Sequence, residues 1–184
     1  MYQIDLNSDM GESFGAYSIG NDDEIIKYVT TANVACGWHG GDPMVMDKVV
    51  KKAAERKVAV GAHPGYPDLM GFGRRKMVLK PSEVKNYIKY QVGALMAFTA
   101  SYGMKLQHVA PHGALGNLCQ YDRSIQAICE AVYEIARPYV FLLVQEQFWG
   151  TRLKKWDWKH CRKYLRTGPT WMICLWYPEG WMEP

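Results

Sequence analysis

The chain has 184 residues, of which 48% are hydrophobic and 22% charged, with 22 Lys and Arg against 18 Asp and Glu. These proportions are typical of one soluble globular domain, and they exclude collagen, a coiled coil and a disordered chain. No apolar run approaches the ~18 residues that a membrane span needs, and the first residues lack the basic and apolar regions of a signal peptide. We therefore expect a cytoplasmic protein with no membrane partner.

Strand-like and helix-like segments alternate along residues 1–144. The apolar segments that predict strands are 2–6, 31–35, 58–62, 106–109 and 139–144. The segments that predict helices begin near residue 21 and cover 44–56, 81–102 and 122–137, and two of them start beside a proline. Strand and helix alternate five times, which predicts an α/β fold with a parallel sheet, either open or closed into a barrel.

Polar side chains collect at the ends of the first four predicted strands, and they include four of the five histidines. Because the carboxyl ends of parallel strands meet at one edge, these side chains are expected to share a site. A lone histidine is more often a hydrogen-bonded structural residue, whereas four of them from separate strands favour a functional cluster. The residues concerned are Asp5, Asn7, Asp9, Glu12, Asn33, Cys36, His39, His63, Arg74, Arg75, His108 and His112.

The residue types leave several kinds of chemistry open. His39, His63, His112 and Asp9 could form a metal site, since imidazole and carboxylate suit zinc or manganese, and the metal's identity is open. Cys36 could be a nucleophile beside a histidine, although buried packing is the more common role for such a cysteine. The glycine-rich segment 61–75 predicts a loop over the site, and an arginine there suits a carboxylate or a phosphate.

Four segments resemble the LamB/YcsF family of 5-oxoprolinase A subunits, in the same order and with the same spacing. They read DLNSDMGE at 5–12, ANVACGWH at 32–39, GAHP at 61–64 and PHGAL at 111–115. The resemblance extends from residue 2 to about residue 143. It implies a (β/α) barrel of the glycoside hydrolase/deacetylase type, and the ATP-dependent ring opening of 5-oxo-L-proline to L-glutamate with 5-oxoprolinase subunits B and C.

The resemblance also suggests roles for individual residues. Asp9 and His112 are assigned to acid/base work, with His63 supporting that role. Asn7, Asn33 and His39 are expected to hydrogen-bond the substrate, and Arg74 to anchor its carboxylate or a phosphate. ATP is the expected cofactor, but the sequence has no Walker-type loop, so either this chain or a partner could bind it. Two departures bear on the site, since Ala110 and Gly116 stand where the family usually has Lys and Tyr.

Residues 149–184 are unlike the rest of the chain. They hold six of the seven tryptophans and 7 basic against 3 acidic residues, without the apolar period of a helix or a strand. A shifted reading of the codons for 162–184 permits a string that resembles the family's next segment. We therefore expect the reading frame to shift near residues 143–146, which divides the chain into 1–144, an incomplete barrel of about five βα units, and 145–184, an out-of-frame tail.

Such a truncation would leave the barrel open, with exposed edge strands and core surface, so the activity of this chain is an open question. Two other functions are compatible with the sequence. One is a metal-dependent deacetylase or amidohydrolase that acts alone, without ATP. The other is a non-enzymatic binding protein, whose basic, tryptophan-rich tail would bind single-stranded nucleic acid. The shifted reading frame explains the same tail residues, so we do not expect nucleic acid as a partner.

Overall fold

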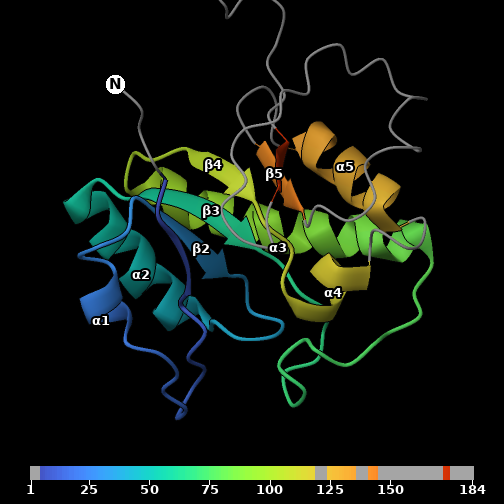
Figure 1. The fold of residues 1–184 in the computed structure, drawn as a ribbon, viewed down its shortest axis with the longest axis horizontal. Helices are drawn as coiled ribbons and strands as arrows, with labels where there is room; N and C mark the ends of the chain where they lie inside the picture. The colour runs from blue at the N-terminus through green and yellow to red at the C-terminus, as the bar shows by residue number, and fades with distance from the viewer. Residues whose placement is uncertain (1–4, 119–123, 136–140, 145–171, 175–184) are drawn as a thin grey trace, which may run out of the picture.

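The structure is a computed structural model that describes residues 5–118, 124–135, 141–144 and 172–174 (Figure 1). Helices and strands alternate through the first four strands, as the sequence predicts. In chain order, the elements are β1 (Asn7–Met10), α1 (Asp22–Ile25), β2 (Thr31–Ala35), α2 (Pro43–Arg56), β3 (Ala59–His63), α3 (Pro81–Ser101), β4 (Leu106–Val109), α4 (Gly113–Leu118), α5 (Ser124–Ile135), β5 (Phe141–Val144) and β6 (Met172–Cys174).

The strands form one sheet in the order β1-β2-β3-β4-β5-β6. The first five pair in parallel and β6 pairs antiparallel with β5, so β1 and β6 are the edges of an open sheet. Helix α2 contacts α3, and α3 contacts α5, so these helices form one layer against the sheet (Figure 1). This arrangement is part of a (β/α) barrel, which confirms the predicted fold class.

The two faces of the sheet differ in chemistry because side chains alternate along each strand. On the face toward the helices, Ala32 and Val34 of β2 and Val60 and Ala62 of β3 belong to the buried apolar core. The opposite face carries polar groups, among them Asn33 of β2, whose side chain bonds to those of other strands. The polar face, which would line the inside of a closed barrel, is where the candidate site lies.

Local interactions at the start of α2 hold the turn that leads from β2 toward the site. The Asp42 side chain caps the helix, and its Oδ1 atom accepts hydrogen bonds from the backbone N–H groups of Met44 and Val45 at 2.8 and 3.0 Å. Its other oxygen accepts from the backbone N–H of Gly15 at 2.7 Å. The cap therefore ties the β2–α2 turn to the loop that follows β1.

Two predicted strand boundaries are corrected by the structure. The first strand was predicted at 2–6, of which residues 2–4 lie outside the described part of the chain and 5–6 are not in a strand. The first described strand is Asn7–Met10, which pairs residue for residue with Thr31–Val34 of β2. The third begins one residue later than predicted and includes His63. Both errors have the same cause, because apolar content was used to place strands whose polar side chains line the second face. Asn7, Asp9, His63 and His108 thus lie within strands and not after them.

Strand β6 was not predicted, because the tail shows no strand period. Helix α4 was not predicted either. The rest of the proposed out-of-frame tail, residues 145–171 and 175–184, lies outside the described residues. Among the described residues, no helix combines the length and apolar character needed to cross a membrane.

Candidate active site

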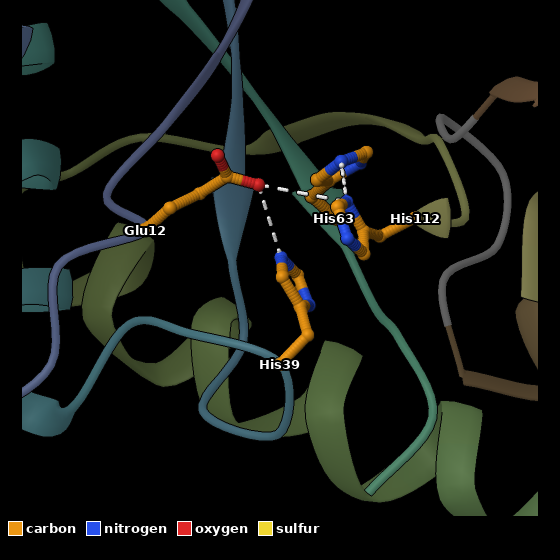
Figure 2. A group of neighbouring side chains, drawn as sticks. All are labelled: Glu12, His39, His63 and His112. Atoms are coloured by element: carbon orange, nitrogen blue, oxygen red, sulfur yellow. Dashed lines mark hydrogen bonds and ion pairs between the residues drawn. The ribbon is translucent and has the colours of Figure 1, made fainter. Parts of the chain in front are cut away.

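Four side chains from four separate segments of the chain meet at the carboxyl ends of β1 to β4 (Figure 2). The Oε1 atom of Glu12 lies 3.2 Å from Nε2 of His39 and 3.5 Å from Nδ1 of His112. That same Nδ1 atom lies 3.0 Å from Nε2 of His63. The three imidazoles are buried, and Glu12 is partly buried. We call Glu12, His39, His63 and His112 the histidine cluster.

Backbone carbonyls fix two of the three rings. The Nδ1 atom of His63 lies 2.5 Å from the carbonyl oxygen of Ala110, and Nε2 of His112 lies 2.8 Å from that of Phe72. Because a carbonyl only accepts hydrogen bonds, each of these nitrogens carries the hydrogen. His39 is held differently, since its ring stacks on that of His112 with centroids 3.7 Å apart.

A polar network on the strands adjoins the cluster. Asn33 donates from Nδ2 to Oδ1 of Asp9 at 2.8 Å and to Oδ1 of Asn7 at 2.7 Å. Its own Oδ1 atom lies 2.5 Å from Nε2 of His108. The second carboxylate oxygen of Asp9 lies 3.5 Å from Nε2 of His63, which joins the network to the cluster.

Burial sets the charge state of this region. It lowers the pKa of His39 to about 3 and that of His108 to about 4. Burial and the neighbouring His39 and His63 lower the pKa of His112 to about 4. Burial also raises the pKa of Glu12, whereas for Asp9 the contacts with His63 and Asn33 outweigh burial and lower the pKa. At neutral pH, Asp9 is therefore a carboxylate, and His39, His108 and His112 are neutral rings.

The two arginines of the loop after β3 have different environments. Arg75 pairs with the buried carboxylate of Asp68, and its Nε donates to Oδ1 at 2.8 Å. Arg74 is exposed and lies over the Phe72 ring, with 5.5 Å from its guanidinium carbon to the centroid. Its charge acts on the Glu12 carboxyl. Arg74 is thus the arginine of the pair that is available to a ligand at the site.

Cys36 does not act as a nucleophile in this arrangement. Its side chain is buried, and its thiol lies 3.2 Å from the carbonyl oxygen of Val34. Burial raises the pKa of the thiol to about 12, so the reactive thiolate is scarce at neutral pH. Buried packing, the more common alternative for such a cysteine, is what the structure shows.

The comparison with known proteins matches the part of the chain that contains the site. The model of the LamB/YcsF family matches residues 4–158, which include every residue of the site. The chain belongs to the LamB/YcsF family. It is 64% identical over 136 residues to the 5-oxoprolinase A subunit of Alkaliphilus metalliredigens, a match that covers 73% of this chain and 53% of the relative. It is 57% identical over 143 residues to the 5-oxoprolinase A subunit of Thermococcus onnurineus, covering 77% and 56%.

A solved structure with a similar sequence has the same fold. The lactam utilization protein from Thermus thermophilus superposes with a TM-score of 0.74 at 48% identity, over 76% of this chain and 57% of that chain. The LamB/YcsF chain spans about half the length of the relatives that it matches.

The structure brings together most of the residues that the sequence singled out, and it adds one to the expected cluster. His39, His63 and His112 meet in the cluster, while Asn7, Asp9 and Asn33 meet in the adjoining network. Glu12 was among the polar residues expected at this edge, but it was assigned no role, and it is the carboxylate closest to the imidazoles. The signal was its position two residues past β1, where a side chain reaches the carboxyl ends of the neighbouring strands.

Proposed function

We propose that this chain is the A component of a 5-oxoprolinase, which opens 5-oxo-L-proline to L-glutamate with ATP and acts with subunits B and C. The observation that carries the proposal is a carboxylate and a group of imidazoles at the strand ends, inside the segment that matches the family. The names of the relatives support the substrate and the multi-subunit assembly.

The substrate's chemistry fits these side chains. A five-membered lactam is a stabilised amide, so its hydrolysis requires activation, and phosphorylation of the amide oxygen by ATP would make the ring carbon electrophilic. Water loses a proton as it attacks that carbon, and the C–N bond then breaks as a proton is delivered to the ring nitrogen. The product is an acyl phosphate, which a second water hydrolyses to L-glutamate and phosphate. In this proposal Asp9 and His112 exchange protons with water and the ring nitrogen, and His63, between them, supports both.

The remaining polar residues would bind the substrate. Arg74 is exposed beside the cluster and would pair with the carboxylate of 5-oxo-L-proline or with a phosphate. Asn7 and Asn33 would hydrogen-bond the lactam. His39 was expected to do the same, but it is buried behind its stacking partner, so we propose that it acts by orienting His112.

The test is a reconstituted assay. The full chain is mixed with subunits B and C of a relative, ATP and 5-oxo-L-proline, and L-glutamate is measured. The expected result is glutamate formation that requires ATP and exceeds that of subunits B and C alone. Formation that is equal with and without this chain would contradict the proposal. Omitting B and C in a parallel reaction tests whether they are required as partners and as the source of the ATP site.

A second function is favoured by the histidine cluster, because three imidazoles and a carboxylate could hold a metal ion. A metal-dependent amidohydrolase or deacetylase would act alone and without ATP. Hydrolysis of an amide or an N-acetyl sugar by the isolated chain, abolished by a chelator, would favour this function over the first.

We propose in addition that residues 145–184 arise from a shifted reading frame, with residues 1–144 as the native part of one barrel domain. The composition of the tail supports this division, while the family match reaches residue 158, past the proposed point of the shift. The nucleotide sequence of codons 140–150 is the test, and codons that are incompatible with the offset reading would refute it.

A further inference from the structure

When His63 and His112 are both neutral, their contact leaves two ring nitrogens facing each other without a hydrogen atom between them. Each ring donates its N–H group to a backbone carbonyl. Nδ1 of His63 donates to the carbonyl of Ala110, and Nε2 of His112 donates to that of Phe72. In neutral rings, the other two nitrogens are both acceptors, and they lie 3.0 Å apart. Two lone pairs at this distance repel unless a proton or a cation lies between them.

Glu12 and His39 complete a set of four donor atoms around this point. Oε1 of Glu12 lies 3.5 Å from Nδ1 of His112 and 3.2 Å from Nε2 of His39, and all four donors lie within 4.8 Å of one another. The ligand atoms of a four-coordinate zinc ion at ~2.1 Å lie about 3.4 Å apart. The spacing of the cluster is therefore close to that of a ligand set.

We infer that Glu12, His39, His63 and His112 bind one divalent transition-metal ion of the zinc class, through Oε1, Nε2, Nε2 and Nδ1 respectively. The carbonyl contacts of His63 and His112 are the outer partners that orient metal-bound imidazoles. His39 lacks one, since within the described residues its Nδ1 atom is buried without a hydrogen-bond partner. Its ring stacks in parallel on that of His112, so the ring must turn for its Nε2 atom to reach an ion that also lies in the plane of His112.

Charge supports a cation more than a shared proton. The site contains a partly buried carboxyl group, Glu12, whose Oε1 atom faces ring nitrogens of His39 and His112 at 3.2 and 3.5 Å. A bound cation would neutralise that carboxylate and occupy the space between the facing lone pairs. It would also give Glu12 a function, which the acid/base proposal does not provide.

The inference deepens the proposed function and rests on it only for the role of the ion. With a metal bound, Nε2 of His63 and Nδ1 of His112 are ligands, so these rings hold the ion in place of exchanging protons, and the acid/base role falls to Asp9. Metal binding itself is measured without substrate, ATP or partner subunits. A chain that binds metal but has no 5-oxoprolinase activity would contradict the proposed function and leave the metal site supported. A chain that has 5-oxoprolinase activity but binds no metal would contradict the metal site and leave the proposed function supported.

The experiment uses the full chain, stripped of metal by a chelator and titrated with Zn²⁺ and with Co²⁺ as a visible probe. We expect one Zn²⁺ per chain and strong visible absorption from Co²⁺ bound by nitrogen and oxygen, without the sulfur-to-cobalt band that cysteine ligands would give. Zn²⁺ should also raise the unfolding temperature, because it binds the folded state. The absence of a bound ion from the unmodified chain would overturn the inference.

Two isosteric carboxylate variants identify the ligand. Glu12→Gln should weaken Zn²⁺ binding by at least ~100-fold, since even the loss of an outer partner costs ~10–100-fold. Asp9→Asn alters a neighbour of the ligand His63, so it should weaken binding by less than Glu12→Gln does and by no more than the ~10–100-fold of a lost outer partner. His108→Gln, which alters a buried imidazole outside the cluster, should bind as the unmodified chain does. Circular dichroism checks that each variant is folded. Unchanged binding in Glu12→Gln, or loss of binding in Asp9→Asn alone, would overturn the assignment of Glu12.

Discussion

The carboxylate of Asp9 lies 3.5 Å from the Nε2 atom of His63, although β1 and β3 are separated in the sheet by β2. Asn33 of the intervening strand makes this approach possible, because its side chain donates to Asp9 from between the two strands. The result is a carboxylate that stays ionised in contact with an imidazole, which is the arrangement that proton transfer requires.

The first prediction concerns the acid/base residues. Asp9→Asn keeps the size of the side chain and removes its charge, and His112→Ala removes the ring that faces Glu12 and His63. Each variant should lower kcat by roughly 10²–10⁴, the usual contribution of a positioned acid or base. Steady-state glutamate formation in the reconstituted assay measures the effect. Near-normal turnover in a folded variant would remove that residue from the catalytic set.

Asp23→Asn is the control for the loss of a carboxylate. Asp23 lies at the surface in α1, where it pairs with Lys52 and Lys48. An exposed ion pair contributes little, so this variant should match the unmodified chain in both kcat and stability. A comparable loss of kcat in Asp23→Asn would show that the effect of Asp9→Asn is a general response to charge.

The second prediction separates the two arginines. Arg74→Ala should raise the KM for 5-oxo-L-proline about 10- to 100-fold, the value of a charged hydrogen bond, with little change in stability. Arg75→Ala should leave this KM unchanged and lower the free energy of unfolding, because the buried Asp68 loses the guanidinium and keeps the backbone N–H groups of Gly71 and Arg75. Assays paired with urea unfolding measure both effects. Equal KM values in the two variants would contradict the assignment of Arg74.

The third prediction is that the metal-free chain loses stability as the pH falls from 6.5 toward 4. His39, His108 and His112 have folded pKa values of about 3 to 4, below the usual 6.5, so in this range the unfolded chain binds protons that the folded chain does not. Above pH 6.5 these imidazoles cost no stability. Below pH 6.5, each of them lowers the free energy of unfolding by about 1.4 kcal/mol per pH unit.

Two carboxyl groups oppose this trend, since burial raises the pKa of Glu12 and Asp22 and favours their protonated forms. Three imidazoles outweigh them, so the net change is a loss. Urea unfolding at several pH values with a chelator present measures it. His108→Gln should flatten the slope by about one proton, and stability that is constant or rises as the pH falls would contradict the buried, neutral state of the rings.

The fourth prediction tests the packing of His108 on β3. A Cβ atom added at Gly61 would collide with Nε2 of His108, so Gly61→Ala must displace that ring from Asn33. Overpacking of this kind costs about 1–3 kcal/mol. Gly93→Ala is the matched control, because nothing lies within 4 Å and an alanine inside α3 should stabilise by about 0.5–1 kcal/mol. Urea unfolding should therefore shift in opposite directions in the two variants.

The order of the elements and the shared edge could be predicted from the sequence because both follow from local patterns. Proline and Asp42 mark the start of α2, and the alternation of strand and helix implies parallel strands with a common edge. That reasoning placed His39, His63 and His112 together, and the structure confirms the contact. It placed β1 too early, because Asn7 and Asp9 do not look like residues of a buried strand.

The finer geometry of the site depends on contacts between distant segments, which local patterns do not contain. The position of Glu12 just past β1 places it near the shared edge, but it does not indicate that the carboxylate contacts His39, 27 residues later. The same holds for the carbonyl of Phe72, which fixes the His112 ring because the chain there adopts a positive φ of 53°. The distinction between Arg74 and Arg75 likewise depends on the position of Asp68, a buried residue of the same loop.

Binding of 5-oxo-L-proline to the full chain, followed by calorimetry, tests the central claim most directly, because it requires neither partner subunits nor turnover. The account predicts saturable binding at one site, weakened in Arg74→Ala and retained in Asp23→Asn. If the folded chain binds no 5-oxo-L-proline, or if Arg74→Ala binds it as well as the unmodified chain, the group of residues at the carboxyl ends of β1 to β4 is not the substrate site.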